Sequence, residues 1–277
     1  MHMNDLISRI RTSSARPSIL TVPAGLILLW AISCPVRALE EPGYPYCYFQ
    51  LTEAQQHVYA DAVSAIWRGL ESFEPEAHIT PDEAEDVMLA VYTDQPQFFW
   101  LKSGYSCEYA HSEGAEDYVT LLTLRYNDLV NDLDRNIAAF DAAADEILDG
   151  LYDLPDYEKE RIAHNRLAER VTYIKGDYDQ NAYSALCLGE SVCSGYTRAF
   201  QYLMNCLDIP SYYCEGTSIE EAIQGQDWAS HSWNIVKLGE GYYNVDVTWD
   251  DTCLSSLGVT SYAYFNQPDS VFDLTHR

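Results

Sequence analysis

The chain has 277 residues, of which 47% are hydrophobic, and its formal net charge is −27 at pH 7. This length and hydrophobic content fit one or two domains with a real core and exclude a disordered acidic tail. The negative charge repels nucleic acid phosphates and anionic lipid heads, so neither is expected as a partner. It favours cationic partners, such as basic peptides or amines, although a soluble surface is the commoner reason for such a charge.

Residues 1–38 are typical of a secretory signal peptide. Three arginines precede an uncharged apolar stretch at 19–32, and a small-residue cleavage site follows at 36–38. Two alternatives stay open: Cys34 lies in a poor lipoprotein box, and the uncharged run 17–36 is about long enough for a membrane anchor. In each case the protein is predicted to be secreted or at the cell surface, touching a membrane only through its N-terminus.

The cysteine count agrees with export. Eight cysteines are present, and Cys34 falls in the predicted signal peptide. The odd number left in an exported chain predicts one free thiol, for which Cys193 is the best candidate, and up to three disulfides. Cys47 with Cys107 is one expected pair, and the other pairings stay open. No CxxC or CxxH pair occurs, so a structural zinc site is not predicted, and the acidic clusters lack the EF-hand spacing of a calcium site. No cofactor is predicted.

Residues 39–128 are predicted to form a small N-terminal α/β unit. The expected elements are a helix over 51–73, a helix from Thr80 to Tyr92, and strands over 98–109 and 118–126. The second helix has a clear start, because Thr80 can cap it and Pro81 suits its first turn. A hairpin loop that contains Gly114 would join the two strands.

Residues 129–277 are predicted to form the catalytic domain. The expected elements are amphipathic helices over 129–151 and 156–174, a loop over 177–191, a helix over 192–207, and strands over 211–215, 232–238 and 242–247. Gly239 to Gly241 would make a tight hairpin between the last two strands. Helices followed by antiparallel strands indicate the α+β class.

Three residues in this region have the chemistry of acyl transfer. Cys193 stands at the start of the 192–207 helix, where free N–H groups and the helix dipole favour a thiolate and could stabilise an oxyanion. His231 is expected to open one strand, and Asp246 lies nearly opposite in the next, within about 5 Å. The set has the parts of a nucleophile, its base and the residue that orients the base.

Short motifs surround these three residues. They are VCSGY at 192–196, HSWN at 231–234 and YNVDVTWDD at 243–251, with AFQYL at 199–203, IP at 209–210 and YFN at 264–266 beside them. Over about residues 155–277 the chain resembles the bacterial transglutaminase-like superfamily, and 94–100 resembles a leader region found in exported members. The resemblance implies a papain-like α+β core, with Cys193 as nucleophile, His231 as base and Asp246 as orienter. Thr197–Arg198 departs from the family pattern, in which small residues are common.

The resemblance implies an exported, cysteine-dependent acyl-transfer enzyme that acts on protein or peptide amides through a thioester. Capture of the thioester by water gives a peptidase or amidase, and capture by an amine gives a transglutaminase. Arylamine acetyltransferases are disfavoured, because their Arg-Gly-Gly lead-in to the cysteine is absent. An alternative from another class is a non-catalytic cell-surface binding module on the same fold, suggested by the 22 tyrosines and the separate N-terminal unit.

Other residues have a structural and a functional interpretation. Trp233 and Trp249 could shield a thioester from water, but core packing is the simpler role. The acidic stretch 215–227 could form a rim that selects basic substrates, but such runs are usually solvated loops. The other histidines show no ligand spacing and are expected to be surface or hydrogen-bonded residues: His57, His78, His111, His164 and His276.

Overall fold

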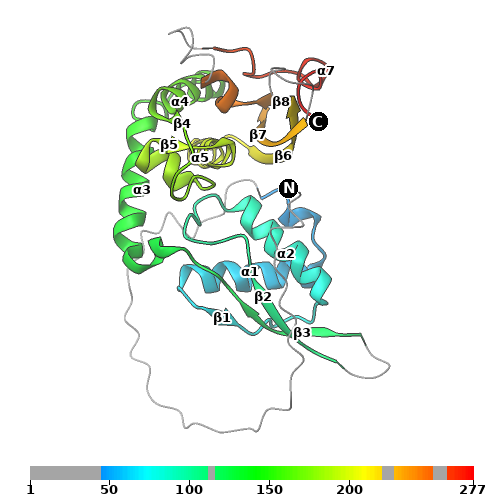
Figure 1. The fold of residues 1–277 in the computed structure, drawn as a ribbon. Helices are drawn as coiled ribbons and strands as arrows, with labels where there is room; N and C mark the ends of the chain where they lie inside the picture. Colours follow the sequence, from blue (N-terminus) through cyan, green and yellow to red (C-terminus); the bar gives the residue numbers. More distant parts are fainter. Residues whose placement is uncertain (1–44, 112–115, 220–227, 252–260) are drawn as a thin grey trace.

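The computed structural model describes residues 45–111, 116–219, 228–251 and 261–277. The predicted signal peptide, the Gly114 loop and most of the acidic stretch after Glu215 lie outside these ranges. Figure 1 shows two parts, one built by residues 45–127, called the N-terminal unit below, and one built by the later residues. Within the described ranges, no helix combines the length and the apolar character that crossing a bilayer requires.

The N-terminal unit packs two helices on a three-stranded antiparallel sheet. The elements are α1 (Glu53–Trp67), β1 (Ser72–Phe73), α2 (Pro81–Asp94), β2 (Ser106–Ala110) and β3 (Tyr118–Thr123), with strand order β1–β3–β2. Both helices begin with a capping box, formed by Thr52 with Gln55 and by Thr80 with Glu83. The helix start predicted at Thr80 and Pro81 is therefore confirmed.

One strand of this sheet is shorter than predicted. The sequence predicts a strand over 98–109, but β2 begins only at Ser106. The backbone turns before it, since the N–H of Leu101 donates to the carbonyl of Phe98 at 2.8 Å. The three aromatic rings at 98–100 are buried in the core. Aromatic residues fill the core from buried turns as well as from strands, so this aromatic run does not by itself indicate a strand.

Two long helices follow, α3 (Leu133–Leu148) and α4 (Asp156–Arg170). The first starts later than predicted, because Asn127 accepts from the N–H of Leu129 at 3.0 Å and begins a 3-10 turn, η4 (Asp128–Asp132). The second stops at Arg170, because β4 (Thr172–Tyr173) leaves it to pair in parallel with β5 (Glu190–Ser191). The predicted loop over 177–191 also holds a π-helical turn, η5 (Ser184–Leu188).

Helix α5 (Cys193–Cys206) packs against a second antiparallel sheet. The strands are β6 (Ser211–Ile219), β7 (Trp228–Leu238) and β8 (Gly241–Val245), in the order β6–β7–β8. The buried side chains of α5 include Tyr196, Phe200 and Leu203, which recur at helical spacing. A short helix, α7 (Asp269–Phe272), follows, and His276 bridges to Ser218 at the outer edge of β6.

The hairpin between β7 and β8 is the predicted tight turn. Leu238 pairs with Gly241, and Gly239 takes the left-handed conformation (φ +57°) that glycine adopts without strain. The start of β7 differs from the prediction, because the strand begins at Trp228 and continues through His231. Its pairing with β6 over this whole stretch extends the strand.

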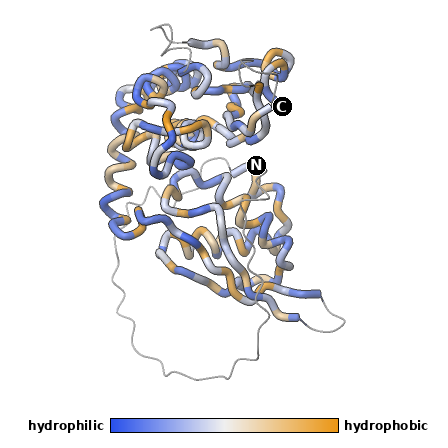
Figure 2. Tube along the Cα trace, viewed as in Figure 1, coloured by the Kyte–Doolittle hydropathy of each residue, from blue (hydrophilic) through white to orange (hydrophobic). Residues whose placement is uncertain are grey.

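One cluster of buried apolar residues runs through both parts of the molecule. It extends from Val58 in α1 to Phe265 near the C-terminus and includes Phe99, Phe140 and Phe200. Helix α4 and the far ends of β2 and β3 are mostly hydrophilic (Figure 2), as expected of elements that face solvent. The two parts therefore share a core, and the predicted boundary near residue 128 stays a prediction.

The structure has the six described cysteines as thiols: Cys47, Cys107, Cys187, Cys193, Cys206 and Cys214. The predicted Cys47–Cys107 disulfide is absent, because the two residues are held at different places. The backbone N–H of Cys47 donates to Asp94 at the end of α2 (3.1 Å), whereas Cys107 lies in β2 opposite Leu122.

Candidate active site

Cys193 is the first residue of α5 and lines a pocket of about 120 Å³. The N-cap, Val192, is extended (φ −113°, ψ 179°), so the chain turns into the helix at the thiol. The loop before it is tied down by Ser191, whose hydroxyl donates to the carbonyl of Asp179 at 2.8 Å. Gly195 allows this close packing, since a Cβ there would lie 2.8 Å from the same carbonyl and would clash with Ser191.

His231 and Asp246 meet at the end of the β7–β8 ladder. The Nε2 of His231 lies 2.7 Å from the Oδ2 of Asp246, and both side chains are buried. The last pair of the ladder is Asn234 with Val245, so the register continued by one step puts Asp246 opposite Trp233. His231 and Asp246 are therefore diagonal neighbours, two residues from direct opposition, where the sequence predicts them nearly opposite each other.

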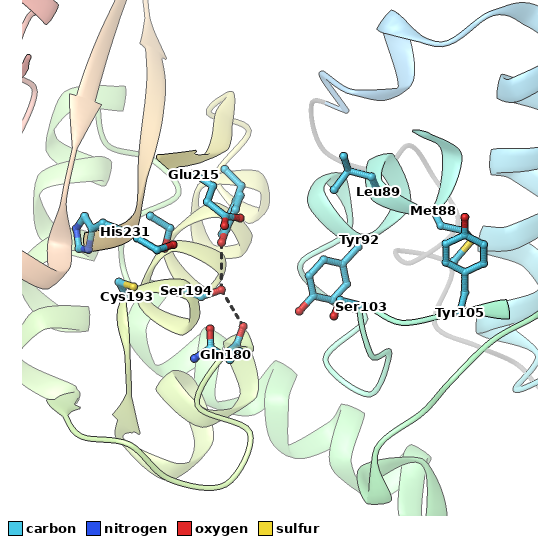
Figure 3. Close-up of a pocket in the computed structure, with 13 residues that line it drawn as sticks. Met88, Leu89, Tyr92, Ser103, Tyr105, Gln180, Cys193, Ser194, Glu215 and His231 are labelled. Atoms are coloured by element: carbon cyan, nitrogen blue, oxygen red, sulfur yellow. Dashed lines mark hydrogen bonds between the residues drawn. The ribbon is translucent and has the colours of Figure 1, made fainter. Parts of the chain in front are cut away.

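The same imidazole shares the pocket with the thiol of Cys193, and each of the two groups shifts the pKa of the other. Because Nε2 faces Asp246, Nδ1 is the ring nitrogen left for Cys193. The order is thiol, imidazole, carboxylate, with the imidazole hydrogen-bonded to the carboxylate and electrostatically coupled to the thiol. Figure 3 shows Cys193 and His231 side by side on one wall of the pocket.

The electrostatic surroundings of Cys193 and His231 favour an ion pair between the thiolate and the imidazolium. Burial raises the pKa of the Cys193 thiol, but the hydrogen bond and charge of His231 and the hydrogen bonds of Ser232 outweigh burial and leave that pKa below 9.0. Burial lowers the pKa of His231, but Asp246 and Cys193 outweigh it and raise that pKa to about 10. For Asp246, burial is outweighed by His231 and His276, and its pKa falls to about 2. Both shifts act in the direction of a thiolate–imidazolium pair.

His276 is a member of this site that the sequence analysis missed. Its Nε2 lies 3.1 Å from the same Oδ2 of Asp246, and its ring is fully buried and stacked on Phe272 with centroids 3.9 Å apart. Thr217 and Arg277 exchange backbone hydrogen bonds of 2.8 Å in both directions, which fixes the segment beside β6. No local motif marks His276, because its partner lies 30 residues earlier and only this backbone pairing joins them.

Two tryptophans and a second buried pair surround the triad. The ring of Trp233 stacks beside His231 with centroids 6.4 Å apart, and that of Trp249 lies 5.7 Å away. His164, predicted to be a surface or hydrogen-bonded residue, is fully buried and contacts Asp250 at 3.1 Å. That pair ties α4 to the chain after β8 and belongs to the framework of the site.

A metal ion does not suit the cluster, although His231, Asp246 and His276 have ligand atoms within 4.8 Å of one another. Zinc takes nitrogen ligands at about 2.0–2.1 Å, which places two tetrahedral ligand atoms about 3.3 Å apart. The 2.7 Å contact between His231 and Asp246 is instead a short hydrogen bond. The geometry of these atoms fits a shared proton network around one carboxylate.

Residues 143–247 match the family model described as the transglutaminase-like superfamily. The matched segment runs from within α3 to the residue after Asp246 and contains Cys193 and His231. It therefore covers the nucleophile helix, the strand that holds the imidazole, and Asp246 directly after β8.

Three solved structures are partly similar. One described as a TGase is 13% identical with a TM-score of 0.35, covering 52% of this chain and 44% of that one. A candidate cysteine protease from Cytophaga hutchinsonii is 18% identical (TM-score 0.30, covering 48% and 52%), and a candidate protease from Parabacteroides distasonis ATCC 8503 is 10% identical (TM-score 0.28, covering 49% and 29%). The chain thus spans about half or less of each structure.

No curated protein matches the chain. The family match contains all three residues of the thiol, imidazole and carboxylate chain. Residues 143–247 are thus similar to the transglutaminase-like superfamily, and this match supports an enzyme at the level of that family.

Proposed function

We propose that this protein transfers acyl groups from protein or peptide amides through a thioester on Cys193. The observation that carries the proposal is the series Cys193, His231 and Asp246 at one pocket, with a buried hydrogen bond from His231 to Asp246, the thiol pKa lowered and the imidazole pKa raised. A structural cysteine in an apolar helix would have its pKa raised, as burial does at Cys187 in this protein, to about 11. A cysteine that served only to pack the core would not need a lowered thiol pKa.

In the first step the Cys193 thiolate attacks the amide carbonyl and forms an S–C bond. The negative charge moves to the carbonyl oxygen, for which the first-turn N–H groups of α5 at Cys193 and Ser194 are suitable donors. The imidazolium of His231 gives its Nδ1 proton to the amide nitrogen, the C–N bond breaks, and an amine leaves. Asp246 keeps the ring in the tautomer and orientation that this transfer needs.

In the second step water or an amine attacks the thioester. The now neutral His231 takes a proton from the attacking group, the C–S bond breaks, and Cys193 leaves as a thiolate. Water gives a carboxylic acid, so the protein would be a peptidase or amidase. An amine gives a new amide, so it would be a transglutaminase. Both outcomes use the same three residues.

The setting of the reaction is also part of the proposal. The signal-like residues 1–38 support secretion or display at the cell surface. The net charge of −27 supports basic protein or peptide substrates rather than nucleic acid.

The test is mass spectrometry of a peptide mixture that contains glutamine and lysine, incubated with the protein purified without its first 38 residues. Cleaved peptides identify a peptidase, and peptides joined with loss of ammonia identify a transglutaminase. Cys193→Ala must abolish either product and the faster, low-pH reaction with iodoacetamide. Cys187→Ala is the matched control, because it removes a buried thiol whose pKa is raised.

Two results would contradict the proposal. Turnover that persists in Cys193→Ala would exclude the thioester. An absence of products together with ordinary reactivity of Cys193 towards iodoacetamide would favour the non-catalytic binding module.

A further inference from the structure

The pocket at Cys193 has one wall that the transglutaminase-like domain does not supply. Across from Cys193 and His231 it is lined by five residues of the N-terminal unit: Met88, Leu89, Tyr92, Ser103 and Tyr105. Figure 3 shows these side chains facing the catalytic residues across the pocket. Leu89 and Tyr92 are three residues apart on one face of α2, and both are half-buried. The opposite face of the helix, with Val87 and Val91, packs into the core.

A buried arginine holds this wall in place. Arg198 of α5 donates from Nη1 to the backbone carbonyl of Tyr92 at 2.5 Å. Its guanidinium lies 3.9 Å from the ring centroid of Tyr92 and 4.7 Å from that of Tyr213, so it is placed between two aromatic rings. Gln201, one turn later on α5, donates to the carbonyl of Thr93 at 3.2 Å. Two successive turns of the nucleophile helix are therefore fixed to the last turns of α2.

This contact explains the departure from the family pattern at Thr197–Arg198. A small residue at position 198 could not reach the carbonyl of Tyr92, and α5 would keep only the hydrogen bond of Gln201 to Thr93. Arg198 is only 4% exposed, and burying a guanidinium is costly unless its surroundings compensate it. The two ring faces, the carbonyl of Tyr92 and the charge of Glu215 offset part of that cost, while Nε stays without a hydrogen-bond partner. The buried guanidinium of Arg198 thus positions α2 beside the active site.

The chemistry of the pocket indicates what it accepts. Leu89, Tyr92 and Tyr213 make the sides apolar, while Glu215 adds a carboxylate at the exposed edge. An apolar cavity of about 150 Å³ can hold a benzene ring, so the volume of about 120 Å³ suits one apolar side chain. An acidic side chain would lose its hydration among the apolar groups and would be repelled by Glu215.

We propose that the N-terminal unit is the specificity wall of the active site: Leu89 and Tyr92 receive an apolar side chain of the peptide beside the reacting amide, and Arg198 positions them. The inference rests on the proposed function, because it assumes that Cys193 reacts with a peptide carbonyl. It assigns substrate selection to residues 45–127, which lie before the family-matched segment.

The test measures alkylation of Cys193 by three reagents that all react at the carbon of the same iodoacetyl group. They are iodoacetamide and two iodoacetylated dipeptides, identical except for leucine or aspartate next to the iodoacetyl group. In each case the Cys193 sulfur displaces iodide and forms a thioether. The value compared is the rate constant of each peptide divided by that of iodoacetamide, so that changes in the thiolate itself cancel. Rates are taken as the difference from Cys193→Ala.

The wild type should prefer the leucine reagent to the aspartate reagent by about tenfold or more. The double variant Leu89→Ala/Tyr92→Ala should bring this preference down to less than about threefold. Arg198→Lys, which keeps the charge but loses the planar stack, should weaken it by an intermediate amount. The matched control Leu188→Ala/Tyr242→Ala removes an exposed leucine and an exposed tyrosine outside the pocket and should keep the wild-type preference.

The outcomes separate the two proposals. An unchanged preference in the Leu89→Ala/Tyr92→Ala variant overturns the specificity wall while leaving the thiolate site intact. A wild type without any preference overturns it as well. If iodoacetamide reacts equally with wild type and Cys193→Ala, the proposed function falls, and the specificity wall falls with it.

Discussion

Asp246→Asn tests the electrostatic arrangement of the site most directly. The carboxylate accepts hydrogen bonds on both oxygens: Oδ2 from His231 (2.7 Å) and His276 (3.1 Å), and Oδ1 from the N–H of Trp249 (3.1 Å). An asparagine must place its NH2 group at one of these positions. In the place of Oδ2, the NH2 group donates to Nε2 of His231, which moves the ring proton to Nδ1, so the ring cannot accept the proton of Cys193. In the place of Oδ1, the NH2 group faces the backbone N–H of Trp249, and two donors then oppose each other.

The magnitude follows from the loss of a buried partner. Removing one member of a buried ion pair costs about 3–5 kcal/mol, because the other charge is left uncompensated. At about 1.4 kcal/mol per factor of ten, turnover should fall by about 10²–10⁴-fold. The upper figure agrees with the loss of about 10⁴ that the equivalent change produces in a serine protease triad.

The assay is the rate of iodoacetamide alkylation of Cys193 between pH 4 and pH 10, taken as the difference from Cys193→Ala. The wild-type midpoint should lie below the ordinary thiol value of 9.0, because His231 and Ser232 lower this pKa. In Asp246→Asn the midpoint should move upward, since the charge of His231 that opposes the effect of burial is weakened. Asp250→Asn, which alters the neighbouring buried carboxylate that bonds His164, should keep the wild-type midpoint. An unshifted midpoint in Asp246→Asn would refute the ion-pair reasoning.

The same variant should alter the dependence of stability on pH. The folded pKa of Asp246, about 2, lies below its ordinary 3.8, so its stabilising effect is present above about pH 4 and is lost as pH falls towards 2. The folded pKa of His231, about 10, lies above its ordinary 6.5, so its effect is present below about pH 6.5 and is lost as pH rises towards 10. The difference in Tm between wild type and Asp246→Asn should be largest between these limits. A difference that is constant from pH 3 to pH 9 would contradict this.

Substitutions at three further positions test the surroundings of the triad. His276→Phe keeps a ring stacked on Phe272 but removes a hydrogen-bond donor to the buried carboxylate of Asp246. We expect kcat to fall about tenfold or more with KM little changed, and the pH midpoint of Cys193 alkylation to rise. His276→Gln restores an N–H donor and should recover most of the loss. Gly195→Ala places a Cβ 2.8 Å from the carbonyl of Asp179, so thermal melting should show a strong loss of stability, and a wild-type Tm would show that the loop yields freely. His164→Ala removes a fully buried ring and should lower stability by about 3 kcal/mol, or Tm by about 6–12 °C, without moving the thiol midpoint.

The sequence was sufficient where a structure depends on neighbouring residues. The Thr80–Pro81 helix start, the turn at Gly239 and the place of Cys193 at the head of a helix were all predicted and are present. Each depends on contacts within a few residues, such as a cap, a positive φ or a helix terminus. The predicted strand over 98–109 was partly wrong, because buried turns and strands draw on the same aromatic residues.

Features that depend on distant contacts required the tertiary structure. The alternating pattern near the hairpin indicated that His231 and Asp246 would be close, but their diagonal relation follows from the observed register. His276 joins them only because a segment 30 residues away pairs with the edge of β6. Arg198 seemed an unexplained departure until α2 was found against it.

The sequence by itself therefore determined the family chemistry: a cysteine at a helix start, and a histidine and an aspartate on neighbouring strands. The tertiary structure decided which groups surround that chemistry, namely a second imidazole on Asp246 and a wall from the N-terminal unit across from Cys193. The physical reason is one of range. Caps, turns and helix starts are set by local backbone geometry, whereas a buried histidine or a pocket wall is set by packing between segments that the chain order does not connect.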